Sequence, residues 1–191
     1  MLYRHALVED IPEILELQKK YHVLTISEED KADGFVTTLF TPEQFKELIE
    51  VEDGITLAVD EARENKIVAY AMAASWEYWS AWPLFEYMIE DLANTTYCGE
   101  QMSTKNSYQY GPIAIDKEYR GKGVMKELFD YSLASMAERY PYMLTFVNQI
   151  NPRSYEAHTR KAGCDVIKTF EFNNNQYWEL GKATRAVEQA K

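Results

Sequence analysis

Residues 116–128 read DKEYRGKGVMKEL and place Gly121 and Gly123 among basic residues. Residues 107–115, just before this stretch, have the apolar character of a strand. After the stretch, apolar residues recur at helical spacing as far as the break at Tyr140-Pro141. The two glycines therefore lie between a strand and a helix.

This position predicts an anion site. A helix N-terminus carries unpaired N–H groups and the positive end of the helix dipole, and a glycine loop lets phosphate approach the backbone closely. Arg120, Lys122 and Lys126 add charged donors nearby. The stretch lacks the spacing of a P-loop, and Lys126 stands where a dinucleotide fingerprint has its third glycine. The alternative is a plain surface turn with solvated lysines.

The composition is typical of one domain, which we expect to span residues 1–191, with 46% hydrophobic and 27% charged residues. A net charge of −11 argues against a nucleic-acid partner and favours a cationic ligand.

The first residues lack the layout of a signal peptide, and no apolar run is long enough to span a membrane, so we expect a cytoplasmic protein. Cys98 and Cys164 lack the spacing of a zinc site or a disulfide framework, so no metal is expected.

Hydrophobic periodicity and turn residues predict the other elements. Strands are expected at residues 2–7, 55–59, 67–74, 107–115, 143–147, 166–172 and 177–180. Helices are expected to begin near Asp10, at a capping box formed by residues 41–44, near Gly123, and at a cap formed by Asn151-Pro152. The short polar link that includes residues 64–66 predicts a hairpin between the strands at 55–59 and 67–74. Asn173-Asn174-Asn175 predicts a turn with left-handed residues, and the chain is expected to fray from Lys182. Residues 25–40, with the acidic run at 28–30, predict a loop or a short irregular helix.

Residues 75–106 form an aromatic-rich insertion, partly at helical spacing, between the third and fourth strands. Aromatic residues at such spacing more often pack in a core than bind a ligand. If they bind one, rings beside carboxylates suit a cationic amine.

Several of these features together resemble the GNAT superfamily of N-acetyltransferases. They are the strand at 110–116, the loop at 120–123 with its helix, the strand ending at Val147, and the segment from Asn151-Pro152-Arg153-Ser154 to Lys161-Ala162-Gly163. The resemblance covers nearly the whole chain. It implies an α/β (α+β) fold with a central mixed, mostly antiparallel sheet flanked by helices.

The resemblance also implies a site for acetyl-CoA as cosubstrate. The family pattern Arg/Gln-x-x-Gly-x-Gly/Ala forms the pyrophosphate loop and is met by Arg120 and Gly123, while Met125 departs from it. The strand would pair its backbone with the pantetheine arm. The residues that would bind the cofactor are Ile113, Ala114, Ile115, Arg120, Gly121, Lys122, Gly123, Val124, Met125, Lys126, Asn151, Ser154 and His158.

The catalytic residues are predicted less completely. His158 and Tyr155 are the candidates for the acid that protonates the leaving thiolate. One residue more than the usual spacing separates His158 from Gly163, and Thr159 occupies the alternative register. Many relatives have a glutamate on the central strand, whereas residues 107–110 offer none, so the base is unassigned, with Glu77, Glu86 or a water chain as substitutes.

The acceptor is expected to be a primary amine on a small molecule or a peptide. The residues expected to contact it are Trp76, Glu77, Trp79 and Tyr108. We therefore expect an N-acetyltransferase in which the amine attacks the thioester directly in a ternary complex. The alternatives are a non-catalytic acyl-CoA-binding or sensor module on the same fold, and an interaction domain with an aromatic binding patch. A homodimer would cover edge strands and exposed rings, and the sequence leaves the oligomeric state open.

Overall fold

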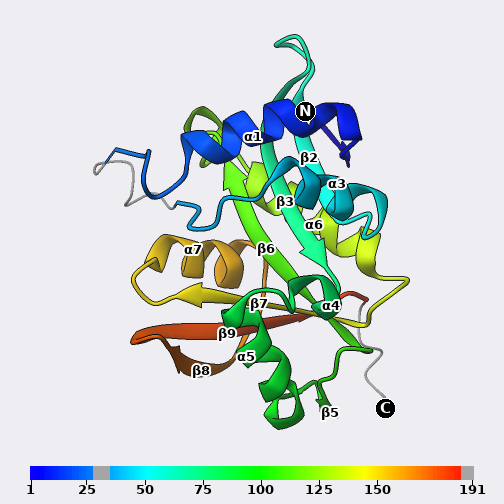
Figure 1. Cartoon of the computed structure of the whole chain (residues 1–191), viewed down its shortest axis with the longest axis vertical. Coiled ribbons are helices and arrows are strands. Elements are labelled where there is room, and N and C mark those ends of the chain that lie inside the picture. The colour runs from blue at the N-terminus through cyan, green and yellow to red at the C-terminus, as the bar shows by residue number, and fades with distance from the viewer. Residues whose placement is uncertain (28–34, 186–191) are drawn as a thin grey trace. The chain divides into compact units, whose positions relative to one another are not determined.

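The computed structural model describes residues 1–27 and 35–185 (Figure 1). The chain divides into two compact units. The first unit combines Met1–Ala73 with Gly111–Ser132, and the second combines Ala74–Tyr110 with Leu133–Lys191. Strand β6 (Ser107–Ile115) contributes residues to both units. The expectation of a single domain over residues 1–191 stays a prediction, and the acidic run at 28–30 lies outside the described residues.

The first unit contains strands in the order β1-β2-β3-β6. β1 (Leu2–His5) pairs antiparallel with β2 (Ile55–Asp60), and β2 pairs antiparallel with β3 (Lys66–Ala74). The predicted hairpin between β2 and β3 is confirmed. Its turn has Glu64 and Asn65 at φ 53° and 60°, the left-handed region that tight turns require.

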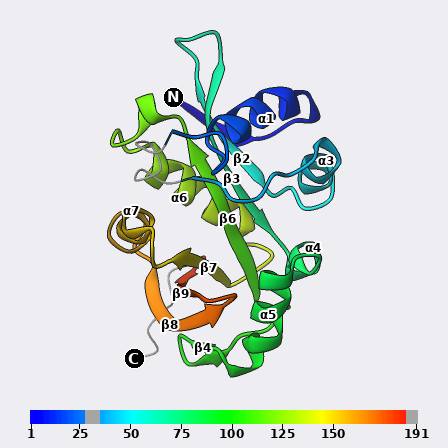
Figure 2. The same ribbon diagram turned by 60° about the vertical axis from the view of Figure 1, so that its left-hand side comes forward.

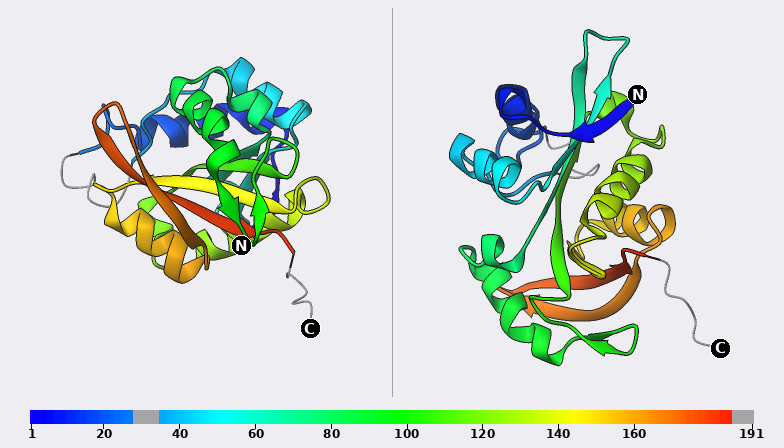
Figure 3. Two further views of the ribbon diagram at one scale, coloured as in Figure 1. Left: turned by 90° about the horizontal axis from the view of Figure 1, so that it is seen from below. Right: turned by 90° about the vertical axis from the view of Figure 1, so that its right-hand side faces the viewer.

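Two helices lie on the same side of these strands, as Figure 3 shows. The helix α1 (Ile11–Lys20) follows the short 3-10 turn η1 (Val8–Asp10), and α3 is Pro42–Glu50. The predicted capping box of α3 is confirmed, because Thr41 Oγ1 accepts the Gln44 N–H at 3.3 Å and Gln44 Oε1 accepts the Thr41 N–H at 2.9 Å. The buried face of these helices comprises Ile11, Ile14, Leu17, Phe45 and Leu48.

The insertion belongs to the second unit and is helical, as predicted (green in Figures 1 and 2). It contains α4 (Trp76–Trp79), α5 (Pro83–Asp91) and the 3-10 turn η2 (Leu92–Asn94), followed by a hairpin of β4 (Thr96–Tyr97) and β5 (Glu100–Gln101). The sequence does not predict this hairpin, whose strands of two residues are too short for a periodic signal. The rings of the insertion pack on one another, with the Trp79 and Phe85 centroids 4.7 Å apart.

The strands of the second unit follow the order β6-β7-β9-β8. β7 (Tyr142–Asn148) is parallel to β6 and antiparallel to β9 (Asn175–Ala183), which pairs antiparallel with β8 (Asp165–Phe172). A mixed, mostly antiparallel sheet flanked by helices is thus confirmed. Asn173 and Asn174 adopt φ 47° and 59°, as their turn predicts. The prediction that the chain frays from Lys182 is wrong at Lys182 itself, because the pairing of β9 with β7 continues to Ala183.

A half-buried ionic cluster ties the insertion to the β8–β9 hairpin. Lys168 Nζ lies 2.5 Å from Asp91 Oδ2, 2.5 Å from Thr95 Oγ1 and 3.5 Å from Glu179 Oε2. Glu179 is only 3% exposed. Burial raises the pKa of Glu179, the charge of Lys168 opposes this rise, and the Asp91 carboxylate adds to it.

We expect Lys168→Met to lower the free energy of unfolding by about 3 kcal/mol, because it leaves the buried Glu179 carboxylate without its cation. The matched control is Lys46→Met, whose exposed partner Glu50 lies 3.9 Å away and should cost less than about 0.5 kcal/mol. Urea denaturation measures the free energy of unfolding of both variants. Adding Glu179→Gln to Lys168→Met should recover part of the stability that Lys168→Met loses. Equal costs for the two lysines would contradict the role of the cluster.

Candidate cofactor and active site

The glycine loop lies in the first unit, between a 3-10 turn and a helix. The turn η3 is Lys117–Tyr119, and α6 (Val124–Met136) begins directly after Gly123. Gly121 and Gly123 have φ of +76° and +88°, and among residues 1–27 and 35–185, apart from the neighbours in the chain, no heavy atom lies within 4 Å of where a Cβ would stand. The first backbone bonds into α6 run from the N–H groups of residues 126 and 127 to Gly123 O, at 3.0 and 3.2 Å. The start of α6 therefore offers open backbone to an anion.

The basic side chains of the loop are partly engaged with the protein. Arg120 Nε donates to Ile115 O at 3.0 Å, and its guanidinium lies 4.8 Å from the centroid of the Tyr21 ring. Lys126 Nζ pairs with Asp130 one turn along α6. Lys122 is exposed, with its Nζ 5.5 Å from the centroid of the Tyr119 ring. Backbone N–H groups are thus the main donors of the loop. The side chain of Val124 is buried, and that of Met125 is half-buried.

Asp116 anchors the approach to the loop. Its Oδ1 accepts the Tyr21 hydroxyl and the Glu118 N–H, both at 3.2 Å, and its Oδ2 accepts Lys20 Nζ at 2.9 Å. Burial alone would raise the pKa of Asp116, but the hydrogen bonds from Lys20 and from the Glu118 N–H and the charges of Lys20 and Lys66 lower it to about 2. The sequence does not indicate Tyr21 or Lys20 as part of this site.

The strand residues of the predicted pantetheine site follow the paired part of β6. The parallel register of β6 with β7 covers Ser107–Gln109 and Tyr142–Leu144. The carbonyl of Tyr110 comes next and accepts the side-chain hydroxyl of Thr145 at 2.8 Å. Residues 113–115 lie beyond this register, in the part of β6 that belongs to the first unit. Their role toward a cofactor stays a prediction.

The predicted cap of the later helix is present in the second unit. Asn151 Oδ1 accepts the Ser154 N–H at 3.1 Å at the start of α7 (Pro152–Glu156), which Figure 2 shows between β7 and β8 along the chain. The helix continues as a π-helical turn, η4 (Ala157–Lys161), and the Ala162 N–H donates to Ala157 O at 3.0 Å. A π turn holds one more residue than an α turn, so it accommodates the extra residue before Gly163.

His158 lies in this π turn and is buried, 5% exposed, with its ring edge-on to Tyr110 at a centroid distance of 6.1 Å. Its Nδ1 is 2.8 Å from Ser154 O, and because a carbonyl only accepts, Nδ1 carries a hydrogen. Burial lowers the pKa of His158, and the bond to the Ser154 carbonyl partly offsets this. In the neutral ring with its hydrogen on Nδ1, Nε2 is the basic nitrogen.

The two other side chains considered for the acid position have separate contacts. Tyr155 packs against Trp178 with a centroid distance of 4.2 Å and is half-buried. Thr159 Oγ1 donates to Tyr155 O at 2.7 Å, a bond within the helix. His158 is thus the most buried of the three.

The residues predicted for the acceptor are mainly core residues in this structure. Trp76, Trp79 and Tyr108 are completely buried, and Trp76 Nε1 donates to Ser107 Oγ at 3.0 Å. Glu77 is exposed, as is Glu86. A side chain with no exposed surface contacts a ligand only after rearrangement, so the packing interpretation fits these three rings better. Their contact with an acceptor stays a prediction.

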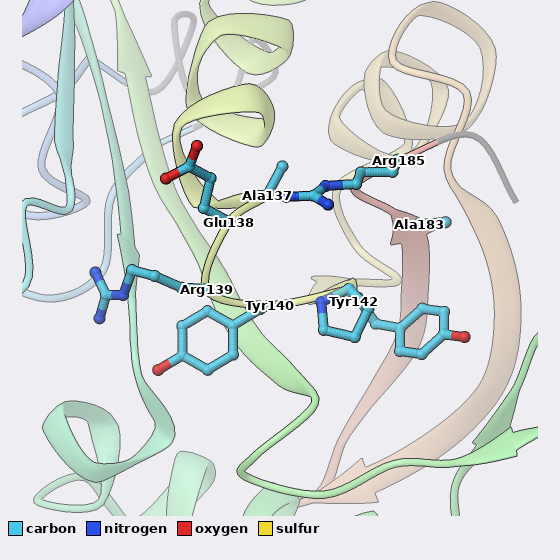
Figure 4. A pocket seen from close by; sticks show the side chains of 8 residues that line it. Ala137, Glu138, Arg139, Tyr140, Tyr142, Ala183 and Arg185 are labelled. Carbon is cyan, nitrogen blue, oxygen red and sulfur yellow. The ribbon is translucent and has the colours of Figure 1, made fainter.

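Two hollows among the described residues are not lined by the glycine loop itself. One of about 370 Å³ lies in the second unit where α6 ends, β7 begins and β9 ends, and Figure 4 shows Arg139 and Glu138 pointing away from Arg185 there. One of about 130 Å³ lies beside Asp116 and Lys20 in the first unit.

Within residues 1–27 and 35–185, no group of three or more His, Cys, Asp or Glu side chains is placed to hold a metal ion. No helix among these residues has the length and apolar character needed to cross a membrane.

The comparisons with known proteins agree with this fold. The profile of the Acetyltransferase (GNAT) family matches residues 11–164. A ribosomal-protein-alanine N-acetyltransferase from Brucella melitensis has a similar structure, with a TM-score of 0.61 and 17% identity, over 96% of this chain and 99% of that one. A GNAT superfamily phosphinothricin acetyltransferase from Sinorhizobium meliloti, solved in complex with AcCoA, has a TM-score of 0.63 and 14% identity, over 100% of this chain and 91% of that one. Among curated protein sequences none matches.

The lowered pKa of Asp116 predicts how stability depends on pH. Because the folded pKa of about 2 lies below the unfolded value of 3.8, Asp116 contributes about 2 kcal/mol above pH 4, and this contribution disappears as the pH falls toward 2. The free energy of unfolding, measured by urea denaturation at several pH values, should therefore be higher for wild type than for Asp116→Asn. The difference between the two proteins should narrow as the pH falls from about 5 to about 2. A difference that stays constant over this range would contradict the assignment.

Proposed function

The chain belongs to the GNAT family of acetyltransferases, and from this premise we propose that it is an acetyl-CoA-dependent N-acetyltransferase. The acetyl group would pass to a primary amine of a small molecule or a peptide by direct attack in a ternary complex. The observation that carries the proposal is the glycine loop before α6, where Gly121 and Gly123 have φ of +76° and +88° and the helix begins directly after them.

The loop fits the pyrophosphate of acetyl-CoA. Both glycines adopt φ values that side chains rarely tolerate, so the conformation depends on their being glycine. Lys122 is exposed beside them and adds a positive charge. Met125, where the family has a small residue, is half-buried and leaves the backbone donors unchanged. Acetyl-CoA bound here would supply an activated acetyl thioester.

The chemistry needs a polarised carbonyl and a route for one proton. A main-chain N–H near Ile113 or Ala114 would polarise the thioester carbonyl. As the amine attacks, a C–N bond forms, the C–S bond breaks, and the amine loses a proton. His158, neutral and with Nδ1–H held by Ser154 O, would accept that proton at Nε2 and return it to the departing sulfur. In this scheme the predicted acid becomes charged only during the reaction, and no separate carboxylate base is needed.

The non-catalytic acyl-CoA-binding module remains the second candidate because of one observation. Many relatives have a glutamate on the central strand, whereas residues 107–110 include none, and Gln109 among them is only 1% exposed. The two candidates share the cofactor loop and differ in acetyl transfer. A measurement of CoA thiol release with a panel of amines distinguishes the two candidate functions, because acetyl transfer releases the thiol and binding alone does not.

The cofactor loop is tested by thermal shift with acetyl-CoA, CoA and ATP. Acetyl-CoA and CoA at a hundredfold excess over Kd should raise the melting temperature by about 5 °C, and ATP should raise it much less. Gly123→Glu should abolish the shift, because its carboxylate would repel the phosphates.

Gly99→Glu is the matched control for this experiment. Gly99 has φ +79° and open space around it, so the same substitution brings the same backbone strain and the same charge to the second unit. This variant should keep the wild-type shift. A wild type that no CoA compound stabilises, or a Gly123→Glu variant that responds normally, would rule out the loop as the cofactor site.

The role of His158 is tested with the amine that gives the highest thiol release. His158→Ala should lower kcat about 100-fold, and Tyr155→Phe should change it less than about threefold. Because the reaction uses neutral His158 and a neutral amine, kcat/KM of wild type should rise with pH through a pKa below 6.5 and rise again as the free amine loses its own proton near pH ~10. A kcat/KM that falls through that pKa would show that the charged ring is required, and a large loss in Tyr155→Phe would move the acid to Tyr155.

A further inference from the structure

Gly121 and Gly123 lie between the three-residue turn η3 and the start of α6, with φ of +76° and +88°. Glycine loses more conformational freedom on folding than any other residue, so a loop of this kind is ordered only if other groups restrain it. Contacts that fix the residues around η3 are therefore restraints on the loop.

Three of these restraints come from Tyr21, at the end of α1. Its hydroxyl accepts the Lys117 N–H at 2.6 Å and donates to Asp116 Oδ1 at 3.2 Å. Its ring lies 4.8 Å from the guanidinium of Arg120, the first residue of the loop. One side chain thus contacts the residue before η3, the first residue of η3, and the residue that follows η3.

We propose that Tyr21 is a positioning residue for the glycine loop and holds its backbone N–H groups in the conformation that receives the pyrophosphate of CoA. This inference rests on the proposed function. It assigns Tyr21 no contact with the cofactor. Arg120 belongs to the same arrangement, because its Nε bond to Ile115 O and its stacking on Tyr21 direct its charge toward the protein.

Tyr21 is itself fixed, as a positioning residue must be. It is only 2% exposed. Its N–H donates to Gln18 O at 3.2 Å, and its carbonyl accepts the Val36 N–H at 2.8 Å. The Gln18 side chain bonds both backbone groups of Phe40, at 3.1 and 2.9 Å. The ring and hydroxyl therefore reach the loop from a part of the unit that is held independently.

The expected consequence is a change in affinity rather than in chemistry. A loop ordered before binding loses less conformational freedom when the cofactor binds, so loosening it weakens binding. Removal of the hydroxyl should raise the Kd for CoA about tenfold. KM for acetyl-CoA should rise in proportion while kcat at saturation stays close to that of wild type.

The experiment compares two ways of removing the same hydrogen bond. Tyr21→Phe removes the hydroxyl and keeps the ring under Arg120. Lys117→Pro removes the N–H donor and leaves Tyr21 intact. Proline suits this position, because Lys117 is the first residue of η3 and Asp116 before it has φ −56° and ψ 132°. Lys117→Ala keeps the N–H and controls for the lost lysine side chain.

Tyr97→Phe controls for the loss of a tyrosine hydroxyl as such. In wild type the Tyr97 hydroxyl donates to Asp165 Oδ2 at 2.6 Å in the second unit. Calorimetric titration with CoA measures Kd for all variants. Amide hydrogen exchange of residues 117–124, without any ligand, measures the order of the loop directly.

Tyr21→Phe and Lys117→Pro should both weaken CoA binding and speed exchange at residues 117–124, while both controls match wild type. If wild type binds CoA and Tyr21→Phe binds it equally well, the inference is wrong and the proposed function stands. Faster exchange without weaker binding overturns it as well. If wild type binds no CoA, the proposed function fails first, and the exchange data alone report whether Tyr21 orders the loop.

Discussion

The start of α6 must be accessible to an anion and must also be held in one conformation, and these two requirements oppose each other. Its first N–H groups can receive an anion only if that anion reaches the backbone closely, and Gly121 and Gly123, with φ values of +76° and +88°, place no side chain in the way. The same glycines remove the side chains that would otherwise stiffen the loop. Buried groups below the loop, above all Asp116 and Tyr21, supply the missing order.

Asp116 can serve in this way because its charge is fully compensated. It is 1% exposed and accepts bonds from a lysine, a tyrosine and a backbone N–H. A buried carboxylate without such partners would be neutralised or would destabilise the fold. The partially exposed Lys20 and Lys66 thus have a structural effect that their position on the surface of an acidic protein does not suggest.

The parts of the fold that follow from local chemistry could be predicted from the sequence. The capping box at Thr41, the asparagine turn at residues 173 and 174 and the Asn151 cap each depend on residues within three positions of one another. The contact of Tyr21 with Asp116 joins residues 95 positions apart, and a single sequence contains no local signal for it. The burial of Trp76 and Trp79 was likewise ambiguous, because the same ring spacing suits a core and a ligand box.

The number of residues between His158 and Gly163 can be read from the sequence, but its effect on the helix could not be predicted from it. The extra residue before Gly163 is visible in the sequence, and an insertion would ordinarily rotate every later side chain of a helix by about 100°. Here the bond from Ala162 N–H to Ala157 O spans one residue more than an α-helical bond, so the insertion is absorbed within one turn. His158 is the second residue of that turn and bonds back to Ser154 O, in the α-helical part before it. The histidine is therefore aligned with the Asn151 cap rather than with Gly163, and the additional residue shifts only the positions that follow it.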